Sequence, residues 1–262
     1  ELPEKVYYRT PEGGIALNRF AKSKKAFDVQ GRPVTIVQGP DRCPRPAVAV
    51  PVFTRLATAG MVSSNRAWAA AAGATVRIFL VGAMAGAGHC HRDKGSFILE
   101  ADGETFAMDR GMTPYEDADN VPFLKSEEAH NLAVPGGCFQ ANPSPCAAAW
   151  EADGDDLRLS AAIDSGRTWL APVIACRRTI ESPRPDLVEI VDEIELAESR
   201  SVRFLLHTVL PVRAAGTVAR IEGTRSVLTV TAAWAQTAAA EGCGVDWSYT
   251  LVNRLAFPAG PA

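Results

Sequence analysis

Apolar and polar residues alternate with a period of two along several short segments of the chain. Residues 157–161 place Leu, Leu and Ala on one side of an extended chain, with Arg and Ser on the other. Residues 245–251 do the same with Val, Trp, Tyr and Leu against Asp, Ser and Thr. Successive side chains of a strand point to opposite faces, so this period predicts strands with one face in a core.

Strand-like segments separated by turn residues recur from residue 75 onward. They are Thr75–Leu80, Ser96–Glu100, Thr105–Asp109, Leu157–Ile163, Trp169–Arg177, Leu187–Leu196, Val202–Leu210, Val218–Ile221, Ser226–Ala233 and Val245–Leu255. Asp102-Gly103, Asp153-Gly154 and Glu222-Gly223 supply residues that tolerate tight turns between them. The spacing predicts an all-β fold, a large antiparallel two-layer β-sandwich with few helices.

The first 74 residues carry a weaker pattern. We expect strands at Val6–Arg9 and Gly14–Arg19, and one short alanine-rich helix at Ser63–Ala72. No repeat or low-complexity tract divides the chain, so we expect a single domain over residues 1–262.

Charge and hydropathy exclude several classes of function. A formal net charge of -3 argues against a general nucleic-acid or anionic-membrane binder, since both need a broad positive surface. The most apolar stretch, Ala67–Ala87, carries Arg77 and falls short of the roughly 20 apolar residues of a membrane span. Residues 1–20 have neither a basic start nor an apolar run, so we expect a signal peptide to be absent or already removed. The 6 cysteines form no CxxC pair, which argues against a cysteine zinc cluster.

A His-x-His pair is the sharpest chemical motif. On extended backbone His89 and His91 lie on the same face, where two imidazoles make either a metal site or an acid/base pair. Asp109 and His130 follow on neighbouring segments, and nitrogen and oxygen donors from successive strands suit Zn²⁺. A lone His-x-His is weak by itself, and Asp109 suits a turn cap equally well. His207 is interpreted as a packed or surface strand residue.

An ordered set of motifs over roughly residues 75 to 210 is more specific than any one of them. The set comprises His89-x-His91-x-Asp93-x-x-Ser96-Phe97, Asp109-x-Gly111, Tyr115, His130-Asn131, Arg178-Thr179-Ile180, Pro185 to Asp192, and Phe204 to His207. It resembles the C-terminal domain of heparinase II/III-like proteins, which include heparin and heparan sulfate lyases and alginate and oligo-alginate lyases.

The resemblance implies a polysaccharide lyase with a zinc ion held by His91, Asp109 and His130. In that family an α/α toroid precedes the sandwich and the active site lies between the two. No series of amphipathic helices precedes Gly88 here, so the toroid has no counterpart and we expect the isolated chain to be inactive or nearly so. The resemblance also implies a periplasmic or secreted location.

Such a lyase cleaves a uronic-acid-containing polysaccharide or oligosaccharide, such as a glycosaminoglycan or alginate, by β-elimination. The resemblance places His89 in the catalytic cleft, where it acts as a base or neutralises the uronate carboxylate. Tyr115 is a second catalytic candidate, although a loop aromatic packed on the sandwich explains it equally well.

Positive residues flank the expected ligands. Arg92, Lys94 and Arg110 are candidates for binding the anionic substrate, and a solvated strand edge explains them nearly as well. Asp93 is expected to hydrogen-bond near the site rather than to bind metal.

Two other functional classes compete with the lyase. One is a non-catalytic carbohydrate-binding or domain-packing sandwich with a structural zinc. The other is a cupin-like metal-dependent isomerase or oxygenase, which requires a redox metal and a third ligand from a much later strand. The position of His130 and the later motifs favour the lyase over the cupin.

Overall fold

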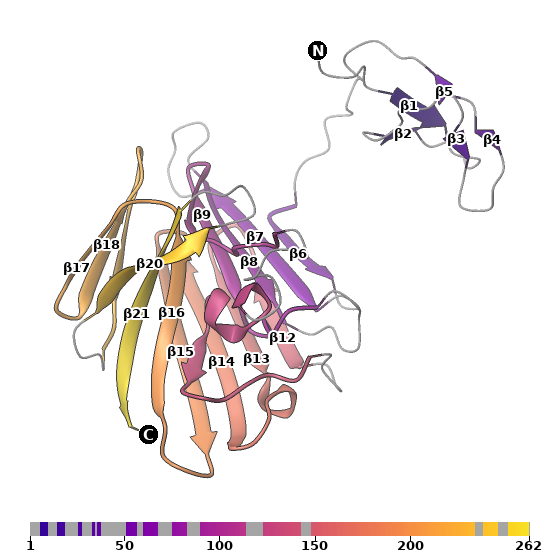
Figure 1. Cartoon of the computed structure of the whole chain (residues 1–262). Helices are drawn as coiled ribbons and strands as arrows, with labels where there is room; N and C mark the ends of the chain where they lie inside the picture. The colour runs from indigo at the N-terminus through magenta and orange to yellow at the C-terminus, as the bar shows by residue number, and fades with distance from the viewer. Residues whose placement is uncertain are drawn as a thin grey trace. The chain divides into compact units, whose positions relative to one another are not determined.

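The computed structural model describes residues 6–9, 15–18, 26–27, 33–34, 36–37, 51–56, 60–67, 75–82, 90–113, 123–142, 148–233, 238–245 and 251–261. The chain divides into two compact units, residues 1–50 and residues 51–262 (Figure 1). The single domain expected over residues 1–262 stays a prediction.

The first unit contains short antiparallel strands. β1 (Val6–Arg9) pairs with β2 (Ile15–Asn18) and with β5 (Ile36–Val37), and β3 (Ala26–Phe27) pairs with β4 (Pro33–Val34). The strand expected at Val6–Arg9 is confirmed, and the one expected at Gly14–Arg19 is confirmed over Ile15–Asn18.

The second unit is built almost entirely of antiparallel strands (Figure 1). One 5-stranded sheet has the order β10-β9-β8-β7-β6, formed by Glu104–Ala107, Phe97–Ala101, Thr75–Val81, Met61–Ala67 and Phe53–Leu56. A 4-stranded sheet has the order β12-β13-β14-β15, formed by Ala149–Gly154, Leu159–Asp164, Val173–Arg184 and Leu187–Leu196.

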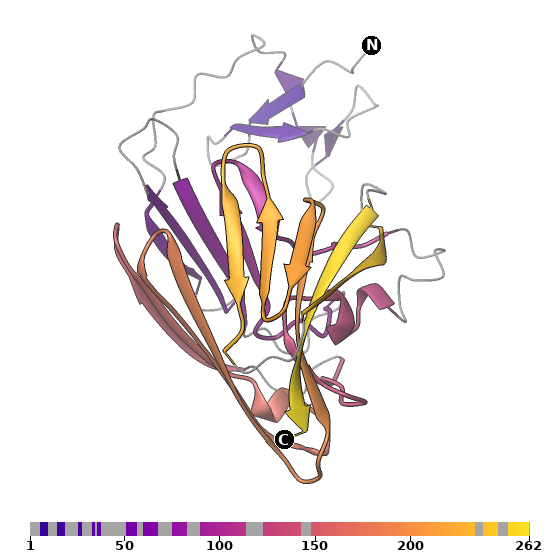
Figure 2. The same cartoon turned by 90° about the vertical axis from the view of Figure 1, so that its left-hand side faces the viewer.

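Two further sheets complete the second unit (Figure 2). The 4-stranded sheet β11-β16-β21-β20 is formed by Ala133–Pro135, Ser201–Thr208, Leu251–Pro261 and Ala239–Val245. The 3-stranded sheet β17-β18-β19 is formed by Val212–Ala215, Val218–Glu222 and Val227–Thr231. The all-β sandwich predicted from the alternating pattern is confirmed.

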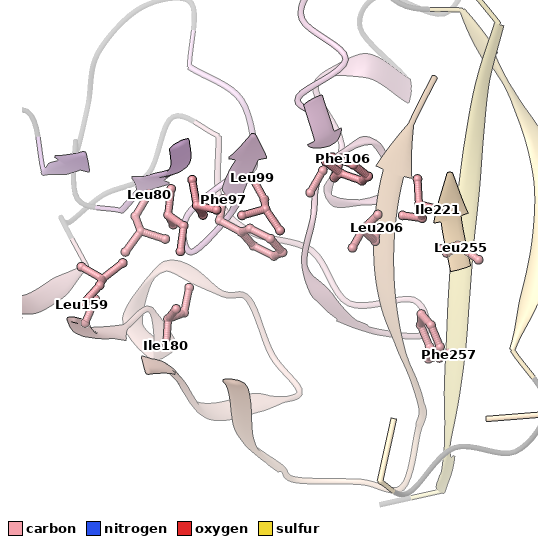
Figure 3. Close-up of a cluster of buried hydrophobic side chains, with 14 of the residues drawn as sticks. Leu80, Phe97, Leu99, Phe106, Leu159, Ile180, Leu206, Ile221, Leu255 and Phe257 are labelled. Carbon is pink, nitrogen blue, oxygen red and sulfur yellow. The ribbon is translucent and has the colours of Figure 1, made fainter. Parts of the chain in front are cut away.

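One large hydrophobic core joins the sheets. Figure 3 shows Leu80 and Phe97 of the 5-stranded sheet on the side that faces Leu159 and Ile180 of the opposite sheet. The same cluster continues to the β16, β18 and β21 strands through Leu206, Ile221, Leu255 and Phe257. Burial of these large apolar side chains is the main favourable contribution to the fold.

The helix predicted at Ser63–Ala72 is wrong over residues 63–67, which belong to strand β7. Val62, Ser64 and Arg66 are buried, while the residues between them are only partly so. Pairing with β6 and β8 on both sides of β7 overrides the helix propensity of the alanines. The rest of the predicted helix, residues 68–72, lies outside the described residues.

The Asp102-Gly103 turn was correctly predicted. Ala101 pairs with Glu104, so the loop between β9 and β10 has only two residues. Asp102 has a φ of 53° and Gly103 a φ of 83°, the left-handed pair of a type I′ hairpin turn. The Asp-Gly sequence therefore determines where β9 ends and β10 begins.

Other strand boundaries differ from expectation. β15 runs from Leu187 to Leu196 as predicted, but β14 spans Val173–Arg184 rather than Trp169–Arg177. Residues 166–168 form a short 3-10 helix before β14. Of the strand predicted at Val245–Leu255, Val245 ends β20 and Leu251 begins β21, while residues 246–250 lie outside the described residues. β10 ends at Ala107, which leaves Asp109 in the loop that follows the strand.

A buried guanidinium ties two loops to this framework. Arg178 on β14 forms a two-pronged ion pair with Asp192 on β15, with Nε to Oδ1 at 2.7 Å and Nη2 to Oδ2 at 2.9 Å. Its Nη1 donates to the carbonyl oxygens of Gly95 and Asn131, each at 2.7 Å. Since Gly95 precedes β9 and Asn131 precedes β11, one side chain determines where both loops sit on the sheet.

Replacing the left-handed glycine tests the turn. Gly103→Ala is expected to lower the free energy of unfolding by about 1 kcal/mol, because an added Cβ disfavours a positive φ even in open space. Gly242 in β20 also has open space around it but has no positive φ, so Gly242→Ala is the matched control and should not destabilise the protein. Urea unfolding measures both; equal midpoints would contradict the type I′ turn.

Replacing Arg178 tests the loop anchor. Arg178→Met is expected to lower the free energy of unfolding by about 3 kcal/mol or more, because it leaves Asp192 and two carbonyl oxygens buried without their partner. The neighbouring Arg177 pairs with Glu151 in the solvent, so Arg177→Met should cost less than about 1 kcal/mol. The prediction fails if chemical denaturation gives similar losses for the two variants.

Candidate functional site

Three loop segments meet beside the end of the 5-stranded sheet. His91 lies in the segment before β9, Asp109 follows β10, and His130 follows a short 3-10 helix at Glu127–Ala129. Asn131 holds these segments together: its Nδ2 donates to the carbonyl oxygens of Phe97, at 2.7 Å, and Met108, at 3.0 Å. The amide therefore joins the His130 loop to the start of β9 and to the residue before Asp109.

Asp109 and His130 form a direct pair. Nδ1 of His130 lies 2.8 Å from Oδ2 of Asp109, and the Gly111 N–H donates to Oδ1 of Asp109 at 2.8 Å. Burial is the largest influence on both groups and opposes their ionisation, but the hydrogen bonds and the opposite charges outweigh it. They lower the pKa of Asp109 to about 2 and raise the pKa of His130 above its ordinary value.

His91 lies against the same pair. Its ring centroid is 5.3 Å from that of His130, and the two rings are tilted by 46°. Burial, followed by the positive charge of His130, lowers the pKa of His91 below its ordinary value. A neutral imidazole is the form of histidine that binds metal ions.

The structure thus brings together the three side chains that the sequence predicts as metal ligands. Within the described part of the chain, however, no group of three or more His, Cys, Asp and Glu side chains is arranged to hold a metal ion as it stands. A hydrogen bond joins Asp109 to Nδ1 of His130, and an ion between them would replace that bond. Two imidazoles and a carboxylate are a donor set that Zn²⁺ accepts.

Two of the three predicted substrate-binding residues are buried. Lys94 is 5% exposed, and its Nζ donates to the carbonyl oxygen of His91, at 3.2 Å, and to Oδ1 of Asp93, at 3.0 Å. Arg110 is 1% exposed, with its guanidinium 4.6 Å from the ring centroid of Phe123. Both therefore hold the loops of the site rather than presenting a charge at the surface.

Arg92 is the more accessible of the three. Its guanidinium lies 5.5 Å from the ring centroid of Phe139, and its Nη1 is 3.9 Å from Oε2 of the buried Glu127. These contacts hold the charge of Arg92 near the surface beside His91. Asp93 accepts a hydrogen bond from the Lys94 ammonium, which is the kind of hydrogen bond near the site that the sequence suggested.

Sequence reasoning missed the buried amides that shape the loops. Gln140 bonds in both directions to the backbone of Lys94, with Oε1 accepting from its N–H and Nε2 donating to its carbonyl oxygen, each at 3.0 Å. Asn131 plays the equivalent part for the His130 loop. The His-Asn pair at residues 130–131 was visible in the sequence, whereas nothing near Gln140 indicated its role.

His207 is packed rather than exposed. It lies on β16 with no solvent exposure, and burial followed by the charge of His130 lowers its pKa to about 3. The two catalytic candidates, His89 and Tyr115, lie outside the described residues.

The structure contains no helix, among the residues it describes, that is long and apolar enough to cross a membrane. A comparison with curated proteins gives no significant match.

Solved structures share the fold at low sequence identity. A heparinase III with methylated lysines superposes with a TM-score of 0.66 at 12% identity, covering 82% of this chain and 34% of the other. The heparan sulfate lyase HepC from Pedobacter heparinus, as a mutant, gives 0.64 at 12% identity, covering 83% and 34%. Another heparinase III gives 0.60 at 15% identity, covering 78% and 33%. The chain therefore spans about a third of the length of these structures.

A family model provides the evidence for membership. The model described as Heparinase II/III-like, C-terminal, matches residues 57–251, which is well over half of the 262-residue chain. The matched range contains all three predicted ligands, His91, Asp109 and His130. The chain belongs to the Heparinase II/III-like C-terminal family.

Proposed function

We propose that this chain is the zinc-binding β-sandwich portion of a polysaccharide lyase, which cleaves a uronic-acid-containing chain by β-elimination. The observation that carries the proposal is the meeting of His91, Asp109 and His130 at the loop ends of a domain from this family. The solved relatives with this fold are named heparinase III and heparan sulfate lyase, which supports a uronic-acid polymer as the substrate class.

The spacing of the donors supports a small divalent ion such as Zn²⁺. Two imidazoles bound to one tetrahedral Zn²⁺, with nitrogens about 2.0 Å from the ion, have ring centroids about 5 Å apart. The rings of His91 and His130 are 5.3 Å apart. Asp109 would supply the carboxylate, because it already lies on Nδ1 of His130. When bound, zinc would supply positive charge and fix the orientation of the loops.

The chain's own residues would divide the remaining work. Removal of the C5 proton of a uronate needs a base and a partner for the developing negative charge. His89 is our candidate base, or the neutraliser of the carboxylate, because it is two residues from His91. The bond between C4 and the glycosidic oxygen then breaks, and Tyr115 is the candidate that donates a proton to this leaving oxygen. Arg92 would meet the anionic chain directly, while Lys94 and Arg110 add positive potential from beneath the surface.

The proposal includes a partner and a location. An α/α toroid domain, as in the lyases that this family resembles, would form the other wall of the active site. A periplasmic or secreted location fits a protein that acts on an extracellular polysaccharide.

A structural zinc in a carbohydrate-binding or domain-packing sandwich is the second candidate. It is favoured by the burial of His130, whose side chain is 1% exposed. An ion held at this site would mainly contact the loops of the protein and would have less contact with a bound sugar. The two candidates differ in whether His89 is needed for turnover.

Metal analysis tests the zinc site. The purified chain is expected to bind one zinc ion, and zinc at about 100 times its Kd should stabilise the fold by about 2.7 kcal/mol. Asp109→Ala removes a proposed ligand and should weaken zinc binding more than about 10-fold. A loss of about 10-fold is what removal of a residue that only hydrogen-bonds to a ligand would give. Asp186→Ala, in the exposed turn between β14 and β15, is the control and should bind like the wild type. Equal zinc affinities for Asp109→Ala and the control would exclude this site.

Turnover tests the lyase. In the full-length protein, His89→Ala is expected to lower kcat at least about 100-fold while zinc content is unchanged, because a positioned acid or base is lost. The readout is the ultraviolet absorbance of the unsaturated uronate formed from heparan sulfate or alginate. Arg77→Ala, which breaks only an exposed ion pair with Glu100, is the control. Full turnover in His89→Ala, with zinc bound, would favour the second candidate.

A further inference from the structure

The loop that follows β11 lies alongside the segment that carries His91. Nδ2 of Asn142 donates to the carbonyl oxygen of Cys90 at 2.9 Å. The side-chain amide of Gln140 bonds in both directions to the backbone of Lys94, each time at 3.0 Å. Because His91 stands between Cys90 and Lys94 in the chain, the loop after β11 is fixed at the edge of the candidate site.

Phe139 is an aromatic residue that this fixed loop exposes. Gln140 forms an antiparallel bridge with Trp169, and both of these side chains are buried. Neighbouring residues on extended backbone point to opposite faces, so Phe139 and Leu170 point away from the core and are 48% and 51% exposed. The Leu170 N–H donates to the carbonyl oxygen of Phe139 at 2.9 Å. An aromatic ring on firmly held backbone is thus presented at the surface.

A guanidinium with unused donors accompanies this ring. The Arg92 guanidinium lies over the ring of Phe139, 5.5 Å from its centroid, and the Arg92 side chain is 34% exposed. In its ion pair with Glu127, Nη1 of Arg92 is 3.9 Å from Oε2, which is too long for a hydrogen bond. Among the residues that the structure describes, the Arg92 side chain makes no hydrogen bond, so its N–H groups are available to an anion.

The two side chains match the two chemical features of an anionic sugar. One face of a pyranose ring carries C–H groups, which pack against the negative face of an aromatic ring. Carboxylate and sulfate groups accept paired N–H donors from a single guanidinium. Arg92 covers only part of the Phe139 ring, and the rest of its exposed surface is open to a sugar. The pair therefore suits a uronate or a sulfated sugar better than a neutral sugar.

We propose that Phe139 and Arg92 form a subsite for one anionic pyranose of the polysaccharide, with the sugar ring on Phe139 and its carboxylate or sulfate on Arg92. The subsite rests on the substrate class proposed above, but it needs neither the bound metal nor the reaction. Its parts are held by the protein before the sugar arrives, so binding spends little on ordering them. The competing role of Phe139 is contact with another domain, which predicts a loss of stability rather than of sugar binding.

Binding of heparan sulfate and alginate hexasaccharides to the full-length protein, in a His89→Ala background that slows cleavage, tests the subsite. Phe139→Ala is expected to raise the Kd about 3- to 10-fold, and by the same factor at low and high salt, because stacking is not ionic. Phe139→Trp keeps an aromatic face and should stay within about twofold of the parent protein. Arg92→Gln is expected to raise the Kd about 10-fold or more at low salt and to weaken its salt dependence.

Leu157→Ala is the matched control, because Leu157 is 63% exposed in the turn between β12 and β13 and should not affect binding. Equal Kd values for Phe139→Ala and the control would overturn the subsite alone. So would a lower melting temperature for Phe139→Ala with an unchanged Kd, which would assign Phe139 to domain packing. A parent protein that binds neither sugar would overturn the substrate class, and the subsite with it. Binding that depends on Phe139 in a protein without lyase turnover would support the subsite and exclude the lyase.

Discussion

The ion pair between Arg178 and Asp192 is the interaction on which the arrangement of the site depends. It lies between two neighbouring strands, where a charged group is costly unless all of its hydrogen-bonding capacity is used. Asp192 neutralises the guanidinium, and the remaining nitrogen is free to hold Gly95 and Asn131. The charge is thus retained in the interior because it organises backbone that has no strand partner of its own.

Asn131 extends the hydrogen-bond network of Arg178 to further segments. Its backbone is held by Arg178, and its amide is shared by Phe97, Met108 and His207. Irregular backbone that enters a core must find partners for its carbonyl and N–H groups. Here a single arginine and a single asparagine provide many of them. The consequence is that His91, Asp109 and His130, which come from three separate segments, are brought to one place without a strand or helix common to all of them.

Much of the sandwich could be predicted from the sequence because its strands have one solvent-exposed face and one buried face. β15 shows the period of two clearly and was located to the residue, and the Asp102-Gly103 turn was identified from its chemistry. β7 was misread because its buried positions include Ser64 and Arg66, which carry no apolar signal. Arg66 is tolerated there because it bonds to Ser182 across the sandwich, a partner 116 residues away that no local pattern reveals.

The candidate site was predictable only in part for the same reason. The candidate ligands His91, Asp109 and His130 follow from residue type and motif order. Lys94 and Arg110 were expected at the surface, as charged residues usually are, but the structure buries both. The parts of Gln140 and Arg178 depend on contacts between distant segments, so residue type alone could not assign them.

The contacts of Arg178 also bear on the order in which the protein assembles. Arg178 is 83 positions from Gly95 in the chain and 47 positions from Asn131. Closing such long loops is entropically costly and slow compared with forming a hairpin. We therefore expect the β14–β15 hairpin to form before the loops of the site adopt their native conformation. The donor groups of the site would then come together late in folding, after most of the native contacts have formed.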